Sequence, residues 1–250
     1  MKFLKQTLLW LFALAILICI GLYIPDSLIV TSQSVGRLLP IYCVETEKPV
    51  VALSFDAAWG NDDTAKILEI LKKHDVKVTF FMTGGWVDNY PDDVKAIAKA
   101  GHDLGNHSEN HKEMSKLSPE ECKDELMRVH KKVKKLTGKD MCLFRPPYGD
   151  YNNTLITVAR DNGYFPVQWD VDSLDWKNYG VQNIKTAILD NSHLGNGSII
   201  LCHNGAKFTA DALEDIITGL QDKGFKIVPI SELIYKETYN INAEGRQLKS

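Results

Sequence analysis

From residue 50 to residue 235 the chain alternates short runs of β-branched and aromatic residues with amphipathic segments of helical periodicity. The first run, "VVALSF", predicts a buried strand, and an amphipathic helix follows it. The segment 118–138 is the clearest helix, because Ser118 and Glu121 can form a capping box at its start. Repeated strand–helix units build a parallel sheet. We therefore predict a distorted (β/α) barrel of about seven units.

An uncharged apolar run at residues 8–24 follows Lys2 and Lys5. A run of this length is near the lower limit for a membrane-spanning helix, about 17–25 residues. A cleaved signal peptide, which would release the chain as a secreted protein, is the alternative. The run is long for such a peptide, and no clear small-residue cleavage site follows it. We expect a transmembrane anchor, with residues 1–7 in the cytoplasm and the folded part of the chain outside.

The remaining boundaries follow from loss of periodicity. Residues 25–47 are expected to be a linker, residues 48–235 the folded domain, and residues 236–250 a polar tail. A net charge of −3 without a block of Lys or Arg gives no basic face for a nucleic acid. The cysteines outside the apolar run lack CxxC spacing, which argues against a zinc cage and leaves a disulfide open. These cysteines are Cys43, Cys122, Cys142 and Cys202. The oligomeric state is left open as well.

Reactive polar side chains follow the predicted strands at their carboxyl ends. They are Asp56, His107, His111, Arg145, Asp175 and His203. Barrels of parallel strands hold their active sites at this end of the sheet. The convergence of these groups at one end predicts an enzyme.

His107 and His111 stand four residues apart in "NHSENH". Two imidazoles at this spacing can bind one divalent cation, but the pair alone is equally consistent with a polar turn. Asp56, after the first strand, could be a metal ligand, a general base or a helix cap. Because Asp62 and Asp63 are better placed as caps, a functional role for Asp56 is favoured.

Three further segments could contribute to catalysis or binding, or could have only a structural role. Arg145, in the proline-stiffened "FRPPYG", could hold a carboxylate in its ionised form or lie in a surface turn. His203, at the end of "IILC", could be a general acid or a buried structural histidine. Asp175 lies in "DVDSLDW", with Trp169 just before this segment and Trp176 at its end. Tryptophans beside carboxylates are typical of sugar-binding clefts, although a single packed tryptophan is equally common.

Taken together, "SFDAAW", "HSENH", "RPPYG", "DSLDW" and "LCH" resemble, in order and spacing, the five motifs of the NodB-homology polysaccharide deacetylases, carbohydrate esterase family 4. The resemblance covers residues 48–235. The apolar N-terminus and "VETEKPVVALSFDAAWG" are also similar to the sporulation-associated PdaB-type branch. The family implies a distorted (β/α) barrel that removes acetyl groups from N-acetylated amino sugars. It also implies a divalent metal ion, with zinc expected and cobalt or another ion as alternatives.

The resemblance implies a role for each residue. Asp56 would be the general base that activates water, and Arg145 would keep it ionised. Asp175 would tune His203, the general acid that protonates the leaving amine. The residues implied to contact the substrate are Tyr148, Trp176 and Leu201.

The chain departs from the family at one metal ligand. His107 and His111 would bind the ion, but the family typically has a second carboxylate, "FDD", where this chain has Ala57. Three outcomes are open. Asp62 or Asp63 replaces the missing ligand, the two histidines bind the metal weakly with water, or the chain binds glycan without hydrolysing it.

We therefore expect a membrane-anchored, extracytoplasmic deacetylase whose substrate is an N-acetylated glycan, the peptidoglycan of the cell wall or spore. The alternative is a catalytically weak or silent glycan-binding protein on the same fold. The matched base and acid favour the enzyme, and Ala57 keeps the alternative open.

Overall fold

The computed structural model describes residues 36–250, and Arg37–Ser250 forms one compact unit. The anchor predicted at residues 8–24 lies outside the described residues, so it stays a prediction. Between residues 36 and 250 no helix is both long and apolar enough to cross a membrane.

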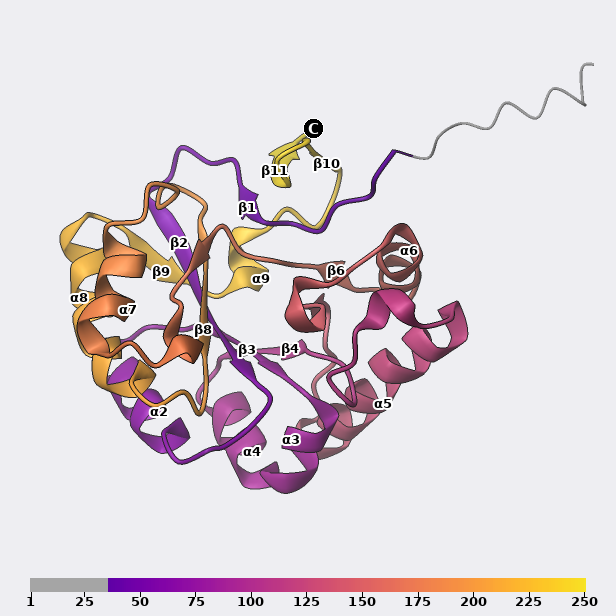
Figure 1. The fold of residues 1–250 in the computed structure, drawn as a ribbon, viewed down its shortest axis with the longest axis horizontal. Helices are drawn as coiled ribbons and strands as arrows, with labels where there is room; N and C mark the ends of the chain where they lie inside the picture. Colours follow the sequence, from indigo (N-terminus) through magenta and orange to yellow (C-terminus); the bar gives the residue numbers. More distant parts are fainter. Residues whose placement is uncertain (1–35) are drawn as a thin grey trace, which may run out of the picture. The chain divides into compact units, whose positions relative to one another are not determined.

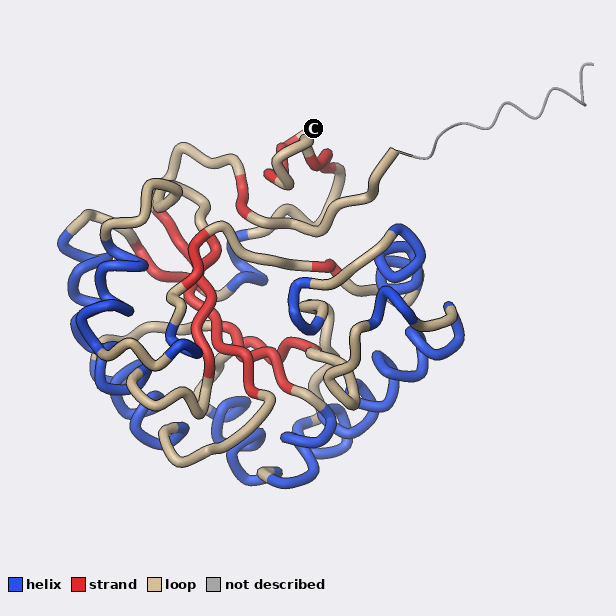
Figure 2. The backbone as a smooth tube through the Cα atoms, viewed as in Figure 1, coloured by secondary structure: helices blue, strands red, loops and turns tan. Residues whose placement is uncertain are grey.

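A curled parallel sheet forms the centre of the domain, with the strand order β6-β5-β4-β3-β2-β8-β7 and with β9 beside the first half of β2 (Figure 2). The strands are β2 (Val50–Ala57), β3 (Thr79–Met82), β4 (Asp103–Asn106), β5 (Leu143–Phe144), β6 (Phe165–Pro166), β7 (Val171–Asp172), β8 (Ile199–His203) and β9 (Lys226–Val228). The strand path is open between β6 and β7, so the sheet is a half-barrel. The predicted (β/α) barrel is confirmed in this incomplete form.

Helices cover the outer face of the sheet (Figure 1). They are α2 (Thr64–Lys73), α3 (Gly84–Asn89), α4 (Pro91–Lys99), α5 (Pro119–Thr137), α6 (Asn153–Asp161), α7 (Val181–Leu189) and α8 (Thr209–Asp222). The short helix α9 (Ile230–Leu233) instead packs with Ala52 and Phe81 in the second core cluster. The capping box predicted for α5 is present: Ser118 accepts from the backbone of Glu121, and the Glu121 carboxylate accepts from the backbone of Ser118. Gly138 ends this helix in the left-handed conformation, with φ of 73°.

Side chains alternate along β2, which places the candidate catalytic carboxylate. Leu53, Phe55 and Ala57 belong to the main core cluster, together with apolar side chains of the surrounding helices. Because successive strand residues point to opposite faces, Ser54 and Asp56 point to the inner face of the half-barrel. β2 therefore delivers one carboxylate to the inside while its other face anchors the helices.

The two chain segments predicted to be irregular are partly ordered into a second, small sheet. β11 (Arg246–Lys249) pairs parallel with β1 (Cys43–Val44) and antiparallel with β10 (Tyr239–Ile241). The expected linker therefore ends inside the domain, and residues 236–250 form a hairpin. Gln247 is fully buried and exchanges two hydrogen bonds with the backbone of Tyr235. The four cysteines of residues 36–250 are free, so the disulfide that the sequence left open is not formed there.

Candidate active site

A cavity of about 430 Å³ opens at the carboxyl ends of the strands. It is lined by Asp56, Trp59, His107, His111, Pro146, Tyr148, Trp169, Asp172, Trp176, Leu201 and His203. Two predicted site residues, Arg145 and Asp175, are fully buried and contact lining residues from behind. The structure thus brings all nine predicted site residues to one place.

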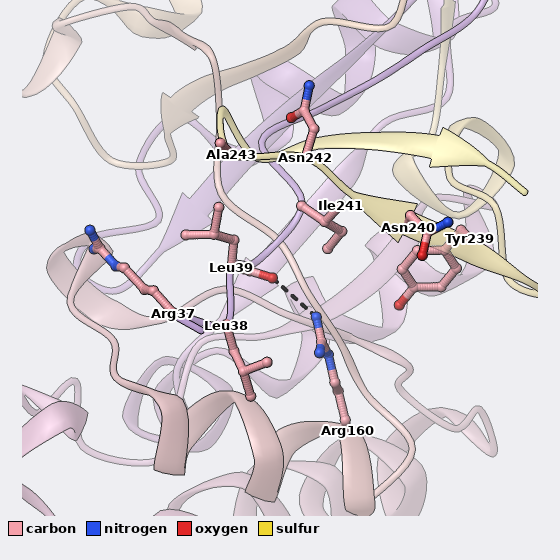
Figure 3. Close-up of a pocket in the computed structure, with 9 residues that line it drawn as sticks. All are labelled: Arg37, Leu38, Leu39, Arg160, Tyr239, Asn240, Ile241, Asn242 and Ala243. Carbon is pink, nitrogen blue, oxygen red and sulfur yellow. Dashed lines mark hydrogen bonds between the residues drawn. The ribbon is translucent and has the colours of Figure 1, made fainter. Parts of the chain in front are cut away.

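A second cavity, of about 460 Å³, lies where residues 37–39 meet α6 and the β10–β11 turn (Figure 3). Arg160 crosses it and donates a hydrogen bond to the carbonyl oxygen of Leu39 at 3.1 Å. Its lining contains no His, Cys, Asp or Glu. It therefore offers no acid, base or anionic metal ligand. The strand-end cavity holds Asp56 and His203 together and is the candidate active site.

Asp56 and Arg145 form a buried ion pair at the floor of the site. Arg145 donates from Nη1 to Oδ1 of Asp56 at 2.7 Å and from Nη2 to the carbonyl oxygen of Gln168 at 3.1 Å. Burial alone would raise the pKa of Asp56, but the charge and hydrogen bond of Arg145, with the charge of His203, outweigh it and lower that pKa. Asp56 is therefore held as a carboxylate. The surface-turn alternative for Arg145 is wrong, because its side chain is fully buried.

His107 and His111 lie against each other after β4, with ring centroids 4.9 Å apart. Nδ1 of His107 donates to the carbonyl oxygen of Arg145 at 2.7 Å, which leaves Nε2 without a proton, 3.5 Å from Oδ2 of Asp56. Burial lowers the pKa of His107 to about 4 and also lowers the pKa of His111. Two neutral imidazoles, one fixed by a carbonyl on its far nitrogen, are what a metal site requires.

The loop between the two histidines is held in place by hydrogen bonds to the side chains of Ser108 and Glu125. Ser108 and His111 both have positive φ, 68° and 52°, and Ser108 Oγ accepts from the backbone N–H of His111 at 2.9 Å. Glu125, buried on α5, accepts from the backbone N–H of Asn110 at 2.8 Å and from its Nδ2 at 2.7 Å. Strained backbone of this kind persists where several contacts fix it. Glu125 has no motif that marks it in the sequence, and only its place on the buried stripe of α5 indicates a structural role.

Asp175 and His203 form the second charged pair. Nδ1 of His203 donates to Oδ1 of Asp175 at 2.7 Å. The other carboxylate oxygen accepts from the backbone N–H of His203 at 2.7 Å and from Oγ1 of Thr209 at 2.6 Å. Burial alone would lower the pKa of His203, but the hydrogen bond to Asp175 and its charge outweigh burial and raise that pKa. His203 is thus poised to carry a proton.

Exposed aromatic rings surround the mouth of the cavity. Trp176 and Tyr148 are exposed, and the Tyr148 ring packs on His111 with centroids 4.5 Å apart. Tyr148 itself has a φ of 60°, which turns the chain sharply after the two prolines. Trp59, which the sequence analysis did not single out, stacks on His203. Its position three residues after Asp56 was the available signal.

No other carboxylate of the described residues lies where the family's third metal ligand would be. Ala57 is fully buried in the core, and neither Asp62 nor Asp63 lines the cavity. Oδ1 of Asp63 instead accepts from the backbone N–H of Gly205 at 2.9 Å. Within residues 36–250 no group of three His, Cys, Asp or Glu side chains is arranged to hold a metal ion. In this structure neither Asp62 nor Asp63 is placed to replace the ligand, whereas the two imidazoles fit as a ligand pair.

Residues 44–167 match the family model described as polysaccharide deacetylase. The chain is 38% identical to the uncharacterized protein YlxY of Bacillus subtilis, over 78% of this chain and 60% of that protein's length. It is 34% identical to the peptidoglycan-N-acetylmuramic acid deacetylase PdaA of B. subtilis, over 78% of this chain and 75% of PdaA.

Solved structures with similar folds include the following two. One is BA3943 of Bacillus anthracis, described as a CE4 family pseudoenzyme, with a TM-score of 0.75, 33% identity and coverage of 84% of this chain and 73% of that one. A mutant of that protein is described as having restored enzymatic activity. The other is the Bc1960 peptidoglycan N-acetylglucosamine deacetylase, with a TM-score of 0.74, 34% identity and coverage of 78% and 92%.

The half-barrel and its strand-end cavity with a paired base and acid define a hydrolase of the NodB type. The chain belongs to the polysaccharide deacetylases, carbohydrate esterase family 4. The predicted family is thereby confirmed, whereas the PdaB-type branch stays a prediction.

Proposed function

We propose that this chain removes N-acetyl groups from the amino sugars of peptidoglycan. The observation that carries the proposal is the presence of two charged pairs, Asp56 with Arg145 and His203 with Asp175, at one cavity. The first pair holds a base in its ionised form, and the second holds an acid in its protonated form. The names of the relatives that act on peptidoglycan support the choice of substrate.

Hydrolysis of an amide needs a base for the attacking water and a proton for the departing amine. Asp56 accepts the proton from water through Oδ2, because Oδ1 is bound to Arg145. His203 donates its proton from Nε2 to the sugar nitrogen, because Nδ1 is bound to Asp175. Asp56 therefore takes a proton on the side of the attacking water, and His203 gives one on the side of the departing amine.

His107 and His111 are the residues that would hold a divalent ion, with zinc expected and cobalt or another ion as alternatives. Such an ion, when bound, lowers the pKa of water and polarises the carbonyl group. The neutral state of both imidazoles suits this role. With Ala57 in place of a third protein ligand, we expect weak binding completed by water.

The substrate is positioned by the rest of the cavity. Leu201, which is buried at the floor, packs against the acetyl methyl group, and Trp176 stacks on the sugar ring. The sharp turn at Tyr148 presents its backbone N–H for the oxyanion that develops during attack. An apolar floor with an aromatic rim suits a sugar bearing an acetamide.

The proposed substrate lies outside the cytoplasmic membrane, which agrees with the anchor expected at residues 8–24. We place the catalytic domain outside the membrane, attached by that segment, or released if the segment is cleaved. A role in sporulation belongs to the same proposal through the PdaB-type resemblance of the N-terminal part.

A second candidate function is glycan binding without turnover. Ala57 favours it, as does the likeness to BA3943, described as a pseudoenzyme. The two candidates share a cavity and differ in whether acetyl groups leave the glycan.

Mass spectrometry of digested peptidoglycan separates them. The full chain is incubated with purified peptidoglycan and a divalent ion, beside the Asp56→Asn variant. We expect deacetylated sugars only with the unsubstituted chain. Saturable glycan binding without any deacetylated sugar would establish the binding function instead.

A further inference from the structure

Trp59 lies flat on the imidazole of His203. The ring centroids are 5.3 Å apart and the planes differ by 19°. Trp59 is 43% exposed at the cavity mouth, whereas only 12% of the His203 side chain is exposed. The indole therefore covers one face of the imidazole while Asp175 binds its edge.

The loop that carries Trp59 is locked to the loop that follows His203. The carbonyl oxygen of Gly60 accepts from Nε1 of Trp86 at 3.0 Å and from Nδ2 of Asn204 at 3.1 Å. Gly205 has a φ of +86°, and a Cβ there would lie 3.1 Å from Cδ1 of Trp59. The contact is thus built by both loops, and the indole cannot swing toward Gly205.

A protonated imidazole is attracted to the face of an indole through the ring quadrupole, and a neutral imidazole gains less. We propose that Trp59 is a positioning residue, which holds the ring of His203 in place for proton donation and favours its protonated form. The role of His203 as the acid rests on the proposed function, but the effect of Trp59 on the imidazole does not.

Several charged groups face His203 besides Trp59. Asp175, Asp56 and Asp172 favour the imidazolium, whereas burial disfavours it. His111, whose pKa is lowered and which lines the same cavity, faces it as a neutral imidazole. The indole has two opposite effects, because it excludes water from the imidazole and also offers its negative face. Of the two, the attraction between the negative face of the indole and the imidazolium is the larger.

Nuclear magnetic resonance of the histidine-labelled full chain measures the pKa of His203 directly. The side-chain resonances of His203 are followed against pH in the unsubstituted chain and in the Trp59→Phe and Trp59→Leu variants. We expect the pKa of His203 to fall by about half a unit in Trp59→Leu and by less in Trp59→Phe. Tyr148→Leu is the matched control, because it removes an exposed ring that packs on His111, and it should leave the pKa of His203 unchanged.

A rise or no change in Trp59→Leu would overturn the proposal, because water exclusion would then equal or exceed the attraction. If Trp59→Leu fails to fold, Trp59→Phe is the test. A fall in the pKa of His203 supports the proposal, and a rise or no change overturns it. In a catalytically active chain, Trp59→Leu should also lower kcat more than it changes KM, and the difference should grow as the pH rises. If the unsubstituted chain releases no acetate, the proposed function is refuted. The effect of Trp59 on the pKa of His203 can still be measured, because the titration does not depend on activity.

Discussion

Arg145 donates a hydrogen bond from Nη1 to Oδ1 of Asp56 at 2.7 Å, and both side chains are buried. The two residues come from the ends of β5 and β2, which are separated in the sheet by β3 and β4. The pair therefore links two parts of the half-barrel and also sets the ionisation of the candidate base. Removing this ion pair should lower both the free energy of unfolding and the activity.

Arg145→Met should destabilise the fold by about 3–5 kcal/mol, because it leaves the Asp56 carboxylate buried without a partner. Urea unfolding measures this change. The matched control is Lys95→Met, which removes an exposed ion pair with Asp92 and should cost less than about 1 kcal/mol. In the double variant Asp56→Asn with Arg145→Met, part of the loss should be recovered. Equal stability of Arg145→Met and the control would contradict the account.

The pH dependence of stability should report on His203. Its native pKa is raised above the value of the unfolded chain, so protonated His203 contributes stability that is fully present below pH of about 6.5. That contribution is lost as the pH rises through the native pKa. The difference in free energy of unfolding between the unsubstituted chain and His203→Gln should therefore shrink from pH 6 to pH 9, roughly. A difference that grows over this window would show that His203 is destabilised as a cation.

His107→Ala and His111→Ala should each weaken divalent-ion binding by at least about tenfold, because each removes one of the two imidazoles proposed as ligands. Isothermal titration with zinc and with cobalt measures the affinity. His193→Ala, which removes an exposed histidine outside the cavity, should bind like the unsubstituted chain. Unchanged affinity in both cavity variants would mean that the ion binds elsewhere.

Ala57→Asp should strengthen metal binding and raise the rate of acetate release if its carboxylate turns from the core cluster, where Ala57 lies at the end of β2, toward His107 and His111. The position is fully buried, so stability must be measured beside activity. Ala57→Asn is the matched control, since it has a similar volume without the negative charge. An unchanged metal affinity in stably folded Ala57→Asp would show that the missing carboxylate is not what limits the site.

The positions of the candidate catalytic residues could be predicted from the sequence because each follows a recognisable strand. In a parallel sheet the carboxyl ends of all strands meet at one edge, so residues far apart in the chain, such as Asp56 and His203, converge. The start of α5 was predictable for a local reason, the capping box of Ser118 and Glu121.

Contacts that depend on packing between loops could not be predicted. Trp59 reaches His203 only because the loops after β2 and β8 are joined through Gly60 and Asn204. The C-terminal hairpin has a polar composition typical of a tail, and it is ordered by pairing with β1 and by the buried Gln247. In both cases the partner is distant in the sequence and carries no local signal.

The rate of acetate release from purified peptidoglycan, measured with added zinc or cobalt, tests the central claim most directly. The unsubstituted chain should release acetate, and Asp56→Asn should be slower by about 100-fold or more, because it lacks the base. No acetate from the unsubstituted chain, or equal rates for both proteins, would contradict the account.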